Sequence, residues 1–124
     1  VAALAFVLLY QPAPGPEVPF AQLEPALQAR IETELADAAA FAELGDLDSA
    51  LQLYQGVLTL HPGNRQATRG MTEAVDTALQ RIERLNREGA LATSAARSNM
   101  EAMLAYESLP AAARERVEQA ASEL

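Results

Sequence analysis

The only histidine and a small group of carboxylates are the residues of this chain that could do chemistry. His61 could act as a general base or bind a metal, but the sequence offers no second histidine and no cysteine to complete a site. His61 directly precedes Pro62 and Gly63, which are typical of a turn. We therefore expect His61 to be a solvated loop side chain.

Three acidic residues, Glu32, Glu34 and Asp37, lie close together on one predicted helix. Paired carboxylates serve acid–base catalysis when a pocket holds them, but helical spacing alone creates no pocket, so we expect a solvated helix face. The sequence has no glycine-rich phosphate loop, no metal-ligand spacing and no nucleophile–base pair. We predict that the protein is not an enzyme and uses no cofactor or metal.

The composition favours an all-α fold. Half of the 124 residues are apolar, much of that share is alanine, and there is no tryptophan. Small side chains and strong helix formers are typical of closely packed helices. The net charge is −8, with arginine as the only basic residue besides His61. Nucleic-acid binders usually carry a basic surface, so we expect no nucleic-acid partner.

Residues 1–10, VAALAFVLLY, form an unbroken apolar run. As a helix this run would be about 15 Å long, whereas a bilayer core needs about 20 residues. Three interpretations remain open. The run is the end of a transmembrane helix, part of a secretory signal, or a soluble helix buried against the domain or a second copy.

The residues that follow favour the transmembrane interpretation. Residues 11–19, QPAPGPEVP, are rich in proline and predict an extended linker. The first basic residue is Arg30, whereas cytoplasmic flanks of membrane helices usually carry Lys or Arg close by. We therefore predict a bacterial inner-membrane protein with its helical domain, residues 20–124, in the periplasm.

Helix signals divide residues 20–124 into about five helices. Pro25 suits a first helical turn, and an apolar stripe from Leu27 to Phe41 precedes Gly45, which can end the helix. Asp46 or Asp48 caps a second helix that ends at His61-Pro62. Further helices are predicted from Asn64 to about Glu88, over 91–108, and from Leu109-Pro110 onward, with Met100 and Met103 in the core. Short turns between them predict antiparallel hairpins.

Residues 31–64 resemble one unit of the tetratricopeptide repeat, a helix–turn–helix motif with small and large residues at fixed positions. The resemblance rests on seven positions, where small residues allow close helix approach and larger ones fill the gaps: Ala38, Phe41, Gly45, Ala50, Tyr54, Val57 and Pro62. It departs from the family at Asp37, where a large apolar residue is expected. A second unit starts at Arg65 but continues as one long helix, so it is either a degenerate repeat or a capping hairpin with an extended helix.

The resemblance implies a groove formed by the first helix of each repeat. Carried over by position, the groove residues are Glu32, Leu35, Ala39, Ala42, Glu43, Gln66, Arg69, Glu73 and Asp76. This set contains more acidic than basic residues, which suggests a protein or peptide partner with basic or apolar character. The family members that bind chaperone tails use lysine in this groove, and this chain has none.

We therefore predict a membrane-tethered protein-interaction module of the tetratricopeptide-like α-solenoid type. One alternative is an extracytoplasmic regulatory domain of a larger membrane protein, such as a sensor kinase or transcription regulator. Another is a soluble helical dimer, held together by residues 1–10 as a buried helix.

Overall fold

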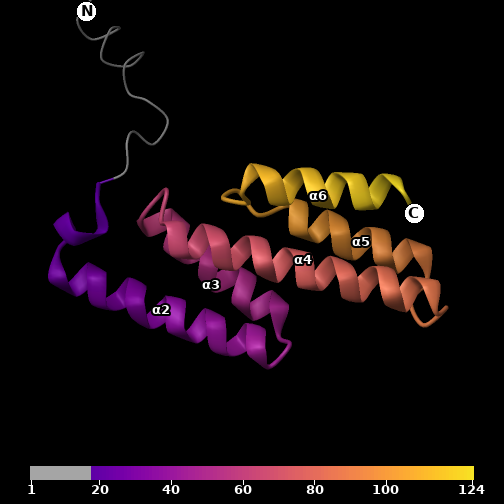
Figure 1. The fold of residues 1–124 in the computed structure, drawn as a ribbon, viewed down its shortest axis with the longest axis horizontal. Helices are drawn as coiled ribbons and strands as arrows, with labels where there is room; N and C mark the ends of the chain where they lie inside the picture. Colours follow the sequence, from indigo (N-terminus) through magenta and orange to yellow (C-terminus); the bar gives the residue numbers. More distant parts are fainter. Residues whose placement is uncertain (1–17) are drawn as a thin grey trace, which may run out of the picture.

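The computed structural model describes residues 18–124, which form five α-helices, one short 3-10 helix and no strand (Figure 1). The all-α prediction is confirmed for this part of the chain. Consecutive α-helices run in alternating directions (Figure 1). Their bounds are η1 Phe20–Gln22, α2 Pro25–Glu43, α3 Leu47–Leu60, α4 Arg65–Arg87, α5 Thr93–Leu104 and α6 Ala111–Ser122.

The ends of the first three α-helices follow from local chemistry. Pro25 is the first residue of α2, where its missing N–H costs nothing. Asp46 caps α3 by accepting from the Ser49 amide at 3.2 Å, and Asn64 caps α4 by accepting from the Ala67 amide at 2.9 Å. Gly45 and Gly89 have φ of 83° and 76°, a left-handed conformation that suits glycine after a helix. These predicted boundaries are confirmed.

α4 is the central helix, because it contacts each of the other four α-helices. It has 23 residues and is about 34 Å long, whereas α3 has 14 residues. α2 packs on α3 and α4, and α5 packs on α6. The first hairpin and the C-terminal helix pair therefore meet mainly through α4.

One hydrophobic core runs through the described helices. Ala38, Ala50 and Val57 are fully buried, and Tyr54 is 6% exposed. Met71 and Met100 are fully buried, and Met103 is 5% exposed, so the predicted core role of Met100 and Met103 is confirmed. Pro62, in the turn before α4, is half-buried.

Two details differ from expectation. Phe41 was predicted to pack in the apolar stripe but is 37% exposed, because no described element covers the edge of α2 on which it lies. The fourth predicted helix was expected to reach residue 108. Instead α5 ends at Leu104, and residues 105–110 form a loop that turns back to α6.

The prediction of a transmembrane helix end at residues 1–10 lies outside the described residues, as does the linker up to residue 17. Within residues 18–124, no helix is both long enough and apolar enough to span a bilayer.

Candidate functional site

The predicted groove residues lie on two helices that pack against each other. α2 and α4 together line two hollows, and we call the surface that carries them the α2–α4 face. Seven of the nine predicted residues line these hollows: Glu32, Leu35, Ala39, Ala42 and Glu43 on α2, and Gln66 and Glu73 on α4.

The first hollow lies beside the C-terminal half of α2 and has a volume of about 310 Å³. Ala39, Ala42 and Glu43 line it from α2, and Gly70 and Glu73 line it from α4. Small residues leave the space between the two helices open, and the two glutamates place negative charge on its walls. The hollow therefore combines a small-residue floor with acidic sides.

Tyr54 of α3 reaches this hollow from below and packs against Gly70. A Cβ atom at residue 70 would lie 2.3 Å from the Tyr54 Cζ atom, far inside normal contact distance. Glycine is thus the residue that allows the ring to lie under the α4 backbone. The sequence pattern identified Tyr54, but Gly70 gave no signal by itself.

The pKa of Tyr54 reflects both its burial and the negative charge in the first hollow. Burial raises the pKa of the Tyr54 hydroxyl above its ordinary value of 10.0, and the nearby Glu73 carboxylate raises it further. Both effects disfavour the phenolate, so the hydroxyl is neutral and available as a hydrogen-bond donor at neutral pH.

The second hollow, of about 510 Å³, lies beside the N-terminal half of α2. Glu32 and Leu35 line it from α2, and Arg65 and Gln66 line it from α4. Leu35 is only 5% exposed, so it belongs mainly to the core and reaches the hollow with its edge. Residues Val18–Phe20 form a further wall.

His61 was expected to be a solvated loop side chain, and this prediction was wrong. It is 6% exposed, and its ring lies 6.0 Å from the ring of Phe20. The Asn64 side-chain amide donates to its Nδ1 at 3.1 Å, which leaves Nε2 to donate to the Val18 carbonyl at 2.6 Å. His61 therefore joins the start of the described chain to the cap of α4, a structural role that spacing could not reveal.

Two predicted groove residues lie apart from these hollows. Arg69 is exposed and lines neither of them. Asp76 accepts from Gln80 at 3.0 Å and forms an ion pair with Arg116 of α6. Asp76 therefore connects α4 to α6, and its charge is already partly compensated.

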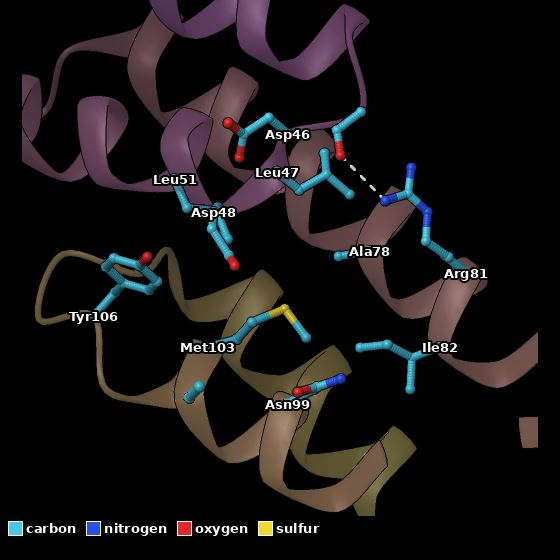
Figure 2. A pocket seen from close by; sticks show the side chains of 12 residues that line it. Asp46, Leu47, Asp48, Leu51, Ala78, Arg81, Ile82, Asn99, Met103 and Tyr106 are labelled. Carbon is cyan, nitrogen blue, oxygen red and sulfur yellow. Dashed lines mark hydrogen bonds between the residues drawn. The ribbon is translucent and has the colours of Figure 1, made fainter. Parts of the chain in front are cut away.

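A further depression, which the sequence did not predict, lies between α3 and α5 and is also lined by α4 (Figure 2). We call it the α3–α5 cleft, and its volume is about 320 Å³. Its lining residues are Gly45, Asp46, Leu47, Asp48, Leu51, Ala78, Arg81, Ile82, Asn99, Ala102, Met103 and Tyr106.

The three carboxylates considered for acid–base chemistry do not share a pocket among the described residues. Glu32 faces the second hollow and Asp37 is exposed, whereas the Glu34 Oε1 atom accepts from the Arg30 Nε atom at 3.3 Å. Over residues 18–124, no group of three His, Cys, Asp or Glu side chains is arranged to hold a metal ion.

Comparison with family models gives one match. The model described as a protein of unknown function (DUF2379) matches residues 20–123. The chain belongs to the DUF2379 family. No curated protein and no solved structure matches it. The DUF2379 description names no ligand, activity or partner.

Proposed function

We propose that this chain is a protein-interaction module that binds its partner on the α2–α4 face and has no catalytic activity of its own. The observation that carries the proposal is the convergence of α2 and α4 around two adjacent hollows. Residues Ala39 and Gly70 are far apart in sequence yet line the same hollow. Concave surfaces with small residues between helices suit an inserted peptide or helix.

The helix packing supports a tetratricopeptide-like arrangement. The first helices of successive hairpins, α2 and α4, contact each other, and α4 in turn contacts α6. In this interpretation α2 and α3 form the one regular repeat, α4 and α5 form an extended second hairpin, and α6 is a cap. A stack of this kind would place α2 and α4 on the binding surface.

The charges of the α2–α4 face favour a partner with basic and apolar side chains. Glu43 and Glu73 line the first hollow with no arginine beside them, whereas Glu32 shares the second hollow with Arg65, so the negative charge is concentrated at the first hollow. Opposite charge on the partner would increase the association rate and disfavour acidic competitors.

The membrane tether remains part of the proposal and rests on the sequence of residues 1–19. An apolar run followed by a proline-rich linker would hold the helical domain close to the periplasmic side of an inner membrane. Fractionation of cells that produce the full-length protein tests this part. Recovery with the membranes supports the tether, whereas a fully soluble protein contradicts it.

Capture from detergent-solubilised membranes tests the binding proposal. The variant Glu43→Arg/Glu73→Arg reverses both charges in the first hollow, and we expect it to lose the captured partner. Glu118→Arg is the matched control, because Glu118 is exposed on α6 and lines neither hollow of the α2–α4 face. The proposal would be contradicted if no partner is captured, or if Glu118→Arg loses the partner as fully as Glu43→Arg/Glu73→Arg does.

A further inference from the structure

The α3–α5 cleft exists because α3 and α5 do not pack extensively against each other. Both helices lie against α4, which is long enough to separate them. Figure 2 shows α3 above the cleft, α5 below it and α4, with Ala78, Arg81 and Ile82, to the right. Because α3 and α5 both pack on α4 and have little direct contact, the space between them is open to a segment of another protein.

The walls of this cleft are held in place at one end. The Gln55 side chain of α3 donates to the Ser108 hydroxyl at 3.0 Å and accepts from the Ser108 amide at 2.9 Å. Arg114 of α6 donates to the Leu104 and Tyr106 carbonyls at 3.1 Å and 3.0 Å. These bonds fix the loop that carries Tyr106. The cleft is therefore largely preformed, which lowers the entropic cost of binding.

The floor of the cleft is apolar and adaptable. Leu51, Ile82 and Met103 come from three different helices, and each is buried with an edge at the cleft. Methionine is unbranched and polarisable, so Met103 can adjust its shape to an inserted side chain. An aliphatic group placed here would leave water and contact all three residues.

Polar groups surround this floor, and few of them bond one another. Figure 2 draws a single hydrogen bond among the lining residues, from Arg81 to the Gly45 carbonyl at 3.1 Å. The side chains of Asp48, Asn99 and Tyr106 lie around the floor, and Figure 2 draws no hydrogen bond from them to another lining residue. An apolar floor with a few convergent polar groups is typical of a binding site.

The charge at the Asp48 end of the cleft is negative. Burial raises the pKa of Tyr106, and the Asp48 carboxylate raises it further, so the two side chains share one electrostatic environment. Asp46 adds a second carboxylate, while Arg81 lies at the α4 side and is bound to Gly45. A positive group on the partner would therefore be stabilised near Asp48.

We propose that the α3–α5 cleft is a second docking site, which takes a protein segment carrying an aliphatic side chain beside an arginine or lysine. The aliphatic group contacts Leu51, Ile82 and Met103, and the cation approaches Asp48. The site is separate from the α2–α4 face, because the two surfaces share only Leu47 among their lining residues. The chain could then hold two protein segments at once.

A random peptide library displayed on phage, selected on the full chain, tests this proposal. We expect selected peptides to combine an aliphatic residue with an adjacent Arg or Lys. Ala102→Trp places a large side chain at an exposed position of the cleft, and should weaken binding at least about tenfold. Ala29→Trp is the matched control on an exposed part of α2 and should leave affinity unchanged.

Charge variants and methionine spectra complete the test. Asp48→Asn should weaken binding several-fold, whereas Asp37→Asn, at an exposed α2 carboxylate, should not. In methyl NMR spectra, the peptide should shift the Met103 signal and leave those of the fully buried Met71 and Met100 in place. Glu43→Arg/Glu73→Arg should bind the peptide normally, which separates this site from the α2–α4 face.

Three results would overturn the proposal. They are failure to select any peptide, selection of acidic peptides, and selected peptides that neither respond to Ala102→Trp nor shift Met103. The NMR readout uses the unmodified protein, so it holds even if a variant fails to fold.

Discussion

Gly70 and Tyr54 show how a single missing side chain shapes the α2–α4 face. A Cβ atom at residue 70 would lie only 2.3 Å from the Tyr54 Cζ atom. The position of the Tyr54 ring therefore requires glycine at residue 70. Because the ring also forms part of the first hollow, this pair affects both the stability of the fold and the shape of the proposed binding surface.

We expect Gly70→Ala to destabilise the protein by about 1–3 kcal/mol, because the added methyl group forces the Tyr54 ring or the α4 backbone to move. Chemical denaturation measures the free energy of unfolding. Gly56→Ala is the control, since a Cβ there would meet only the Glu34 Oε2 atom at 3.9 Å. This control should be neutral or stabilise by up to about 1 kcal/mol, as alanine favours helix. Equal effects of the two changes would contradict the packing described here.

Tyr54 also predicts a pH dependence. Its pKa in the folded state is raised above the ordinary value of 10.0 by burial and by Glu73. The folded chain therefore retains the proton at pH values where the unfolded chain loses it. The stabilising effect is complete below about pH 10 and is lost as the pH rises through the folded-state pKa.

Ultraviolet titration of a variant with Tyr10→Phe and Tyr106→Phe isolates Tyr54, because the chain has three tyrosines. We expect ionisation above the ordinary value, and Glu73→Gln should lower the pKa while leaving the effect of burial. A Tyr54 pKa at or below 10.0 would show that the ring is not buried beside Glu73.

At the scale of the helices, local signals in the sequence predicted much of the fold. Asp46 and Asn64 are caps, Pro25 starts α2, and Gly45 and Gly89 take the left-handed conformation after helices. Each signal depends on a few neighbouring residues, so it can be read without knowing the tertiary structure. The same holds for the core positions Ala38, Ala50 and Val57, which follow helical periodicity.

Features that depend on contacts between residues far apart in the sequence could not be predicted from local signals. His61 is buried by Val18 and Phe20, which lie far from it in sequence, and Phe41 is exposed because nothing described covers it. The early end of α5 reflects the bonds from Gln55 and Arg114 to the following loop. The α3–α5 cleft depends on the relative lengths and packing of three helices.

The Gln55–Ser108 contact allows a test at this scale. We expect Gln55→Ala to cost about 1–3 kcal/mol, because the part-buried Ser108 amide loses its partner. Amide hydrogen exchange at Ser108 should accelerate as the loop loosens. Gln52→Ala, at an exposed position of the same helix, should change neither quantity by much. Unchanged exchange at Ser108 in Gln55→Ala would show that this contact does not hold the loop.

The whole molecule is an acidic helical protein, with a net charge of −8 and α4 at the centre of its packing. The α2–α4 face and the α3–α5 cleft both present carboxylates beside apolar or small residues. Since α4 contributes to both surfaces, one helix could position two partner segments relative to each other.

Site-specific photo-crosslinking tests the central claim, binding at the α2–α4 face, most directly. A photoreactive side chain is placed at Ala42 in the first hollow, or at the exposed Ala90 in the turn after α4 as a control, in the full chain in its native cells. We predict a defined protein adduct from position 42 that is absent from position 90 and is lost with Glu43→Arg/Glu73→Arg. No adduct at position 42, or the same adducts from both positions, would contradict the account.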